Sequence, residues 1–389
     1  MKLEKIKIIN FGFDPWSRYW KRNQTLFSLL NSTLKADSAL FVNPAIWFAD
    51  LLRNPKSIFD CNLRYVITRV VSGNIAVNTP VYLPYASRIG IVREITSYLY
   101  KVNLSLKGDE KIVLILNDLQ ADRELVDMIA SKAFLTIFDW SDDFVEFSSN
   151  DEERQVCTQR CRHYCLISDI VLTINEDLKN RATEINENSY VIKNATNYFT
   201  FDESLGDSER CQSLRRFGNP VIGYIGWLNG LRLDSDLIRY VAESRPNYQF
   251  VFMGPKSEEF PLGTDLPRMK NIHIIPPVPY SQYPACLRAL DVCILPNLIN
   301  AHTNGNDPIK LYDYLASGNP VVATKTAGTE AFSDVLNLAD NKEHFLKLLD
   351  HAIHDRSEPQ KDRRIEIARQ NSWQRRMVEV EEILGKFLS

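Results

Sequence analysis

The sequence predicts an α/β protein made of two Rossmann-like halves. In each half, short apolar runs alternate with stretches of helical periodicity, the pattern of a parallel sheet covered on both faces. Between the halves, residues 197–219 lose this periodicity and become polar. A chain of 389 residues is long enough for two domains, each with its own core. We therefore predict a first domain over residues 1–197, a linker over 198–219, a second domain over 220–370 and a C-terminal helix over 371–389.

The runs that predict strands are short and rich in β-branched and aromatic residues. In the first half they are Lys5–Asn10, Ala39–Val42, Tyr65–Thr68, Lys111–Leu116, Phe134–Phe138, Ile170–Thr173 and Tyr190–Ile192. In the second half they are Val221–Ile225, Gln249–Met253, Ile272–Ile275, Val292–Leu295 and Val321–Ala323. Helical periodicity marks Trp20–Leu30, Arg88–Tyr100, Asp234–Ser244, Tyr280–Ala289, Pro308–Ser317, Lys342–His354 and Trp373–Leu388.

Composition narrows the class of protein. A net charge of −3 gives no support to nucleic acid as the main partner. The first ten residues have no apolar core typical of a secretion signal, and no apolar run approaches the ~20 residues that span a bilayer. We expect a cytoplasmic protein, with contact to the inner face of a membrane left open.

The seven cysteines show no disulfide-framework spacing. Cys157, Cys161 and Cys165 repeat every four residues near His163, so on a helix they form one stripe. Such a stripe could bind a metal, but structural zinc sites usually use tighter cysteine pairs. We expect these thiols to be core residues and expect no metal cofactor.

The segment from Asn306 to Ala323 reads as a capped helix that leads into a buried strand. Asp307 can act as N-cap, with Pro308 at the first helical position and Gly318 as the left-handed stop. Lys310 and Asp313 share one face of this helix. A lysine beside free first-turn amides attracts a phosphate, and a carboxylate one turn deeper can accept hydrogen bonds from sugar hydroxyls. The alternative is an amphipathic helix with ordinary surface charges.

The run Pro-x-Lys-x-x-Asp-Tyr-Leu-Ala-x-Gly-x-Pro-Val-Val in this segment resembles the donor-binding segment of GT-B glycosyltransferases, particularly bacterial enzymes of the teichuronic-acid, capsule and exopolysaccharide type. The resemblance implies two Rossmann-like domains facing a cleft, and a C-terminal helix, anchored by Trp373, that crosses back to the first domain. It also implies that Asp313 holds the donor ribose and Lys310 the diphosphate. This chain departs from the commonest motif, Glu-x7-Glu, because Gly305 stands eight positions before Asp313.

Other segments extend the resemblance over most of the chain. They are Gly223–Leu228 (strand and glycine loop), Asn271–Tyr280 (main-chain groups for the base), Val191–Ala195 (end of the first domain), Asp14–Trp16, Arg22–Gln24 and Val42–Pro44. The donor-binding residues expected from it are Gly226, Trp227, Arg232, Val278, Tyr280 and Asn306, with Lys310 and Asp313. Gly226 could equally form a simple strand-to-helix turn, and Arg232 could be a solvated arginine.

In the first half, three aspartates follow an expected buried strand: Asp139, Asp142 and Asp143. Ligands of open parallel sheets bind beyond the strand carboxyl ends, and inverting transfer needs a base to deprotonate the acceptor hydroxyl. We slightly favour Asp143, with helix capping as the alternative for each aspartate and a metal-binding acidic cluster as a further reading.

Gly12, Arg18 and Arg22 follow the first expected strand and could meet the acceptor. Arg22 could equally be a cation on a helix surface. The function that the resemblance implies is transfer of a sugar from a nucleotide-diphosphate sugar to a saccharide or lipid-linked saccharide, without metal or cofactor, in surface polysaccharide synthesis. The alternatives are a GT-B-like sugar-nucleotide epimerase and a non-catalytic donor-binding member of a glycosyltransferase assembly.

Overall fold

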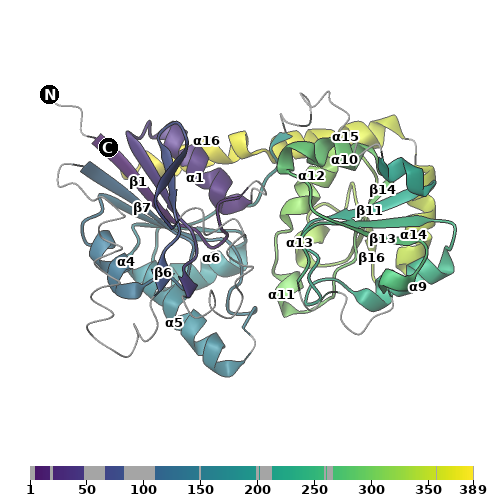
Figure 1. The fold of residues 1–389 in the computed structure, drawn as a ribbon, viewed down its shortest axis with the longest axis horizontal. Helices are drawn as coiled ribbons and strands as arrows, with labels where there is room; N and C mark the ends of the chain where they lie inside the picture. Colours follow the sequence, from purple (N-terminus) through teal and green to yellow (C-terminus); the bar gives the residue numbers. More distant parts are fainter. Residues whose placement is uncertain are drawn as a thin grey trace. The chain divides into compact units, whose positions relative to one another are not determined.

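The chain folds into two compact units, residues 1–192 with 379–389 and residues 193–378. The computed structural model describes residues 5–17, 21–47, 66–82, 110–148, 150–198, 201, 213–257, 260, 266–355 and 357–388. Each unit has its own sheet, shown in Figure 1. The α/β prediction with two parallel-sheet domains is confirmed.

The first unit is built on an eight-stranded sheet in the order β10-β9-β8-β7-β1-β2-β5-β4. Neighbouring strands run parallel, except that β4 and β5 are antiparallel. A separate two-stranded pair joins β3 and β6. The bounds are β1 (Lys5–Phe11), β2 (Ser38–Val42), β3 (Ile46–Trp47), β4 (Arg69–Ser72), β5 (Ile75–Asn78), β6 (Val81–Tyr82), β7 (Glu110–Leu116), β8 (Leu135–Trp140), β9 (Ile170–Thr173) and β10 (Ser189–Val191).

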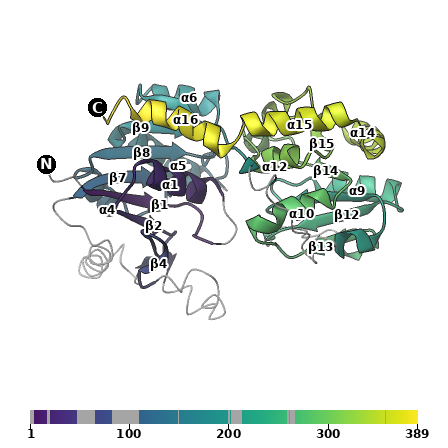
Figure 2. The ribbon, with the colours of Figure 1, turned by 90° about the horizontal axis from the view of Figure 1, so that it is seen from above.

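Helices cover both faces of this sheet (Figures 1 and 2). They are α1 (Arg22–Thr33), α4 (Arg123–Ala130), α5 (Asp151–Ile167), α6 (Glu176–Thr183) and the end of α16 (Trp373–Leu384). Alternate strand residues such as Ile9 and Phe138 share a core with α4 and α5. The opposite face packs on α1, where the Phe27 and Phe41 ring centroids lie 5.4 Å apart.

The second unit has a six-stranded parallel sheet in the order β13-β12-β11-β14-β15-β16. Read from its first strand, this is the doubly wound order 3-2-1-4-5-6 of dinucleotide-binding folds. The strands are β11 (Val221–Ile225), β12 (Gln249–Met253), β13 (Ile272–Ile275), β14 (Val292–Leu295), β15 (Val321–Thr324) and β16 (Asn337–Ala339). All five strands predicted for this half are therefore present, and β16 is additional.

The helices of this unit form two packed groups, α9 with α14, and α12 with α10 and α15 (Figure 2). Their bounds are α9 (Ser235–Ser244), α10 (Tyr283–Arg288), α11 (Ala301–Asn304), α12 (Ile309–Ser317), α13 (Ala327–Glu330), α14 (Lys342–His354) and α15 (Glu358–Gln370). Short 3-10 turns are η3 (Ser213–Phe217), η4 (Leu266–Arg268) and η5 (Tyr280–Gln282).

Several local predictions need correction. The strand near the predicted run Tyr65–Thr68 is Arg69–Ser72, which forms a hairpin with Ile75–Asn78 through a turn where Gly73 has a φ of +51°. The predicted helix Arg88–Tyr100 lies outside the described residues. Helix α12 begins at Ile309 with Pro308 as N-cap, so Asp307 is not its cap.

The cysteine stripe lies on α5. Cys161 and Cys165 are buried, and burial raises the pKa of the Cys165 thiol to about 12, so the core prediction is confirmed for these two. Cys157 is only half-buried. Cys286 of α10 is disulfide-bonded, which the spacing did not predict.

The C-terminal helix α16 contributes to both units. Trp373 is buried, and its backbone N–H donates to Thr196 O at 3.0 Å. Later residues of the helix contact the first unit. Glu381 accepts from Thr33 Oγ1 at 3.0 Å, and Lys386 lies over the Tyr190 ring. In the described ranges, no helix has the length and apolarity needed to cross a bilayer.

Candidate functional site

The predicted donor residues gather at the carboxyl ends of the second sheet. Strand order reverses between β11 and β14, and ligands of doubly wound sheets bind outside the strand ends at such a switch point. Gly226 and Trp227 follow β11, and the side chain of Lys310 reaches this position from α12. The topology thus brings together residues that are far apart in sequence.

Gly226 lies directly beneath the lysine. It has a φ of +155°, and a Cβ built there would lie 2.5 Å from Lys310 Cε and 3.4 Å from the Tyr224 hydroxyl oxygen. The aliphatic stem of Lys310 therefore occupies the space that a side chain would need. From the sequence, we expected the space at Gly226 to admit a diphosphate. In the structure, the stem of Lys310, the residue expected to bind the diphosphate, occupies this space.

Gly254, which follows β12, was missed by sequence reasoning. Its φ is +154°, and a Cβ there would lie 1.8 Å from Gly226 O. The Gly226 N–H donates to Met253 O at 2.9 Å, so the segment that follows β11 stays in contact with the end of β12. The signal available in the sequence was a glycine immediately after a buried strand, as at Gly226.

Lys310 lies over the ring of Tyr224, and Arg232 is close enough to act on the Tyr224 hydroxyl. Lys310 Nζ lies 5.2 Å from the ring centroid. Burial raises the pKa of the Tyr224 hydroxyl, and the nearby positive charge of Arg232 opposes that shift. The hydroxyl donates to Trp227 O at 3.0 Å, while the Trp227 side chain remains 41% exposed. Two cations at a strand end match the charge of a diphosphate.

Asp313 of α12 lies in a buried hydrogen-bond network. Only 6% of it is exposed, and its Oδ1 accepts from Thr196 Oγ1 at 2.7 Å and from the Tyr280 hydroxyl at 3.0 Å. Burial raises the pKa of its carboxyl to about 7, and the two hydrogen bonds oppose that shift. Thr196 was missed by sequence reasoning because nothing in its neighbourhood marks a partner 117 residues away.

Asp307 precedes α12 and hydrogen-bonds to Asn194 and to Tyr312 of that helix. Its Oδ2 accepts from Asn194 N at 2.6 Å and its Oδ1 from the Tyr312 hydroxyl at 2.7 Å. The neighbouring Asn306 is half-buried, and its carbonyl oxygen would lie 2.1 Å from a Cβ at Gly328. Asp307 thus holds the loop that precedes the lysine.

Val278 has no exposed surface, so its side chain belongs to the core. Val278 therefore contributes to packing beneath this end of the sheet.

In the first unit, Arg22 and Asp139 bind each other. Asp139 lies inside β8 and not beyond it, and it is fully buried. Its carboxylate accepts from Arg22 Nη2 at 2.7 Å and from Asn117 Nδ2 at 2.8 Å. Arg22 Nη1 also donates to Ile192 O at 2.8 Å. This buried ion pair gives Arg22 and Asp139 a structural role in the first unit.

The other two aspartates follow β8. Asp143 Oδ2 accepts from Arg181 Nη2 at 2.5 Å, and its side chain is 12% exposed. Asp142 Oδ1 accepts from the Asp143 backbone N–H at 3.0 Å. Asp142 therefore bonds within the local turn, whereas Asp143 pairs with Arg181 on α6.

Of the residues expected to meet the acceptor, only Gly12 and Arg22 are described; Arg18 lies outside the described residues. A Cβ at Gly12 would lie 2.2 Å from the Phe41 ring. The small size of Gly12 is therefore a packing requirement of this unit.

Asp118, which follows β7, was missed by sequence reasoning. It is 5% exposed, and burial raises the pKa of its carboxyl to about 6. Its Oδ1 accepts from Gln120 N at 2.8 Å, and its backbone oxygen accepts from the Tyr164 hydroxyl. Among the described residues it forms no ion pair, in contrast to Asp139 and Asp143. The sequence signal was a carboxylate directly after an apolar strand.

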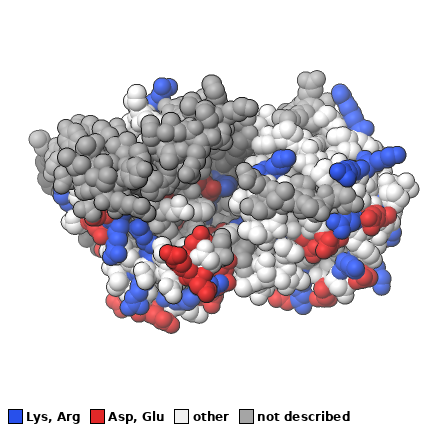
Figure 3. Space-filling model, turned by 60° about the horizontal axis from the view of Figure 1, so that its bottom comes forward, with Lys and Arg blue, Asp and Glu red and all other residues white. Residues whose placement is uncertain are grey.

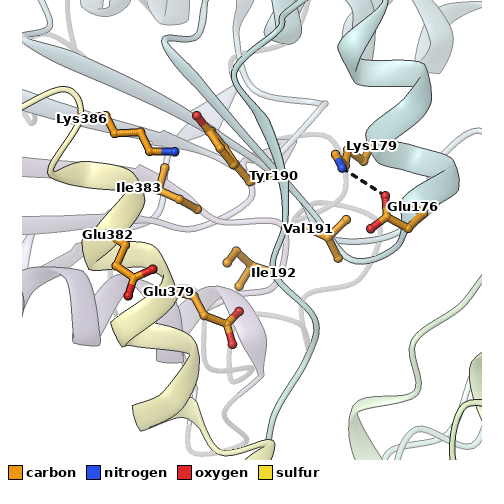
Figure 4. A pocket seen from close by; sticks show the side chains of 9 residues that line it. All are labelled: Glu176, Lys179, Tyr190, Val191, Ile192, Glu379, Glu382, Ile383 and Lys386. Carbon is orange, nitrogen blue, oxygen red and sulfur yellow. Dashed lines mark hydrogen bonds and ion pairs between the residues drawn. The ribbon is translucent and has the colours of Figure 1, made fainter.

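On the described part of one face of the molecule, no patch of a single charge marks a further site. Acidic and basic side chains are interspersed on the described surface of the face shown in Figure 3. A groove between α6, β10 and α16 contains Glu176, Lys179, Tyr190 and Lys386 (Figure 4). Lys179 Nζ pairs with Glu176 at 3.2 Å and Lys386 Nζ lies 4.9 Å from the Tyr190 ring centroid, so both lysines already contact groove residues.

Comparison with known families concerns mainly the second unit. The family described as "Glycosyl transferases group 1" matches residues 219–355. This part of the chain is similar to that family. Over 157 residues, 40% of the chain, it is 25% identical to TuaH of Bacillus subtilis (strain 168), which bears the name of a teichuronic acid biosynthesis glycosyltransferase. The matched region spans 39% of the length of TuaH.

Solved structures are similar to this chain over nearly its whole length. Anabaena Alr3699/HepE in complex with UDP has a TM-score of 0.64 and 13% identity, with 98% of this chain and 100% of that chain covered. Sucrose-phosphate synthase of Thermosynechococcus elongatus has a TM-score of 0.69 and 10% identity, with 99% of each chain covered. The α,α-trehalose-phosphate synthase (UDP-forming) of Burkholderia vietnamiensis has a TM-score of 0.68 and 12% identity, also with 99% of each chain covered. These likenesses show the fold, and the GT-B prediction is confirmed.

Proposed function

We propose that the protein is a glycosyltransferase that moves a sugar from a nucleotide-diphosphate sugar to a saccharide or lipid-linked saccharide acceptor. One observation carries the proposal: Lys310 crosses Gly226 at the switch point of a group 1 domain, on the helix that also carries Asp313. UDP in the HepE complex supports a UDP-sugar donor. The name of TuaH supports a role in surface polysaccharide synthesis.

The donor roles follow from the geometry of the second unit. Lys310 and Arg232 neutralise the diphosphate as it becomes the leaving group, where two cations and first-turn amides stabilise the charge without a metal. Asp313 accepts hydrogen bonds from the ribose. The backbone around Val278 faces the base, and Trp227 and Asn306 contact the transferred sugar.

The acceptor is proposed to bind the first unit. If transfer is inverting, a carboxylate at the carboxyl ends of that sheet takes the hydroxyl proton. Asp118 suits this task because it is partly desolvated and forms no ion pair within the described residues. Asp142 and Asp143 remain candidates, whereas Asp139 is held by Arg22 in a buried ion pair.

Calorimetric titration of the full-length protein with UDP, ADP and GDP tests the donor site. Lys310→Ala should weaken binding of the preferred nucleotide by about 1.5–3 kcal/mol, the worth of a hydrogen bond to a charged group. Lys342→Ala is the matched control, because Lys342 also begins a helix and lies 5.0 Å from the ring centroid of Tyr240, on α9. Equal effects of the two substitutions, or no binding of any of the three nucleotides, would refute the proposal.

A non-catalytic donor-binding protein is the second candidate. Gly305 replaces the first glutamate of the common motif, and two of the three predicted aspartates bind arginines. Nucleotide-sugar binding with no UDP release in the presence of polysaccharide or lipid-linked acceptors would favour this function.

A further inference from the structure

The carboxylate of Asp313 is held through one of its two oxygens. Both hydroxyl donors, Thr196 Oγ1 and Tyr280 Oη, bind Oδ1. Oδ2 accepts no hydrogen bond from any residue that the structure describes. A buried carboxylate has acceptor capacity for several donors, so half of this capacity is left for another partner.

The two hydroxyl groups are fixed by their surroundings. The Thr196 backbone pairs with the segment before α16, because Thr196 N donates to Asn371 O at 3.1 Å and Trp373 N donates to Thr196 O at 3.0 Å. The Tyr280 hydroxyl accepts from Asn197 N at 3.4 Å, and its ring packs on Tyr283 with centroids 5.3 Å apart. The Thr196 backbone and the Tyr280 side chain are therefore held by contacts other than those with Asp313.

We propose that Thr196 and Tyr280 are positioning residues that orient Asp313 through Oδ1, so that Oδ2 accepts the ribose hydroxyls of a nucleoside diphosphate. Tyr280, which sequence reasoning assigned to donor contact, acts on the donor through Asp313. This inference rests on the proposed function, because it takes Asp313 as the ribose ligand. It adds a mechanism by which donor affinity depends on pH.

The pH dependence follows from the competition between burial and hydrogen bonding. Burial raises the pKa of Asp313 to about 7, so this carboxylate is half protonated near neutral pH. Only the ionised form accepts at both oxygens, so affinity for the ribose should rise as pH increases through this value. The hydroxyl donors lower the pKa, so removing either one should move the midpoint to higher pH.

Other charged groups around α12 bind elsewhere. Arg364 of α15 donates to Gly318 O at the far end of the helix, and Arg376 of α16 donates to Asn371. Asp307 accepts from Asn194 and Tyr312, and Lys310 lies over the Tyr224 ring. The pKa of Asp313 is therefore set by burial, which raises it, and by the hydrogen bonds from Thr196 and Tyr280, which lower it.

The test is calorimetric titration of the full-length protein with UDP between pH 6 and 9. The variants are Thr196→Val, its hydroxyl-bearing partner Thr196→Ser, Tyr280→Phe and Asp313→Asn. Asp313→Asn supplies the reference curve, because UDP has its own phosphate ionisation near pH 6. Circular dichroism and thermal unfolding establish that each variant is folded.

Thr196→Val and Tyr280→Phe should each move the midpoint of the affinity curve upward by about one pH unit, because a hydrogen bond to a charged group is worth roughly this much. At pH 7 the dissociation constant should rise several-fold, and at pH 9 it should return close to the wild-type value. Thr196→Ser should follow the wild-type curve.

A loss of affinity that is the same at every pH, or no loss at all, in both Thr196→Val and Tyr280→Phe would overturn the positioning role. The proposed function would survive that result if Asp313→Asn still weakens UDP binding. Wild-type affinity in Asp313→Asn would instead overturn the ribose assignment itself. If Tyr280→Phe does not fold, the Thr196→Val and Thr196→Ser pair decides between the outcomes.

Discussion

Replacing Gly226 with alanine should disable the donor site by displacing a lysine that lies 84 positions further along the chain (310 − 226 = 84). The new Cβ would lie 2.5 Å from Lys310 Cε, too close for any real contact, and a φ of +155° is strained for alanine. The lysine stem is flexible, so it should move away at little cost to folding. The backbone strain should cost roughly 1–3 kcal/mol of stability.

The effect on binding follows from what the lysine does. If Lys310 makes one charge-assisted hydrogen bond to the diphosphate, its displacement should cost about 1.5–3 kcal/mol, or about 10- to 150-fold in the dissociation constant of UDP. Calorimetric titration of Gly226→Ala, Lys310→Ala and the double variant with UDP measures the coupling energy between the two residues in UDP binding. Because Gly226→Ala acts through the lysine, it should add almost nothing to Lys310→Ala.

Gly73→Ala is the control that separates the effect of backbone strain from the effect of displacing a neighbouring side chain. Gly73 also has a positive φ, of +51°, but a Cβ there would meet nothing within 4 Å. This variant should lose stability and keep its UDP affinity. Additive losses of affinity in the double variant, or a Gly226→Ala protein that binds UDP normally, would refute the link between the glycine and the lysine.

Three further predictions concern the first unit and the leaving group. Arg22→Met should lower the free energy of unfolding by about 3–5 kcal/mol in urea titrations, because it leaves Asp139 buried without its cation, and adding Asp139→Asn should recover part of the loss. Asp118→Asn should reduce turnover by about 10²–10⁴-fold with little change in UDP affinity, and wild-type turnover should decline as the pH falls below about 6, where Asp118 becomes protonated. If Asp143→Asn instead shows the larger loss of turnover, the base is Asp143. Activity should survive EDTA, and loss that manganese or magnesium restores would show that the leaving diphosphate needs a metal.

The sequence predicted the arrangement of Lys310, Asp313 and Gly226 better than that of the polar residues in the first unit, and the physical reason is the range of the interactions. Lys310 and Asp313 sit on one short helix whose face is readable from spacing alone, and Gly226 ends a strand that an apolar run marks clearly. The acceptor residues depend on partners that spacing does not reveal. Arg22 and Asp139 looked accessible in sequence because each lies 117 residues from the group that buries it.

The same limit explains the error at Asp307. Local preference makes an aspartate before a proline a good helix cap. In the folded chain, its oxygens instead bind Asn194, which lies 113 residues away, and Tyr312 on the helix itself. A tertiary partner thus overrode local preference. Similarly, the hairpin at Gly73 was missed because both of its strands are only four residues long and the first of them is mostly exposed.

The Arg22–Asp139 pair also constrains the order in which the first unit can fold. Arg22 bonds to Asp139 and Ile192, which lie 117 and 170 residues away along the chain. Bringing such distant segments together costs loop-closure entropy before any contact compensates for it. Removing either charge from water before the other arrives is unfavourable. Early collapsed states should therefore keep the start of α1 hydrated, and this helix should dock only after β8 and the chain beyond β10 are in place.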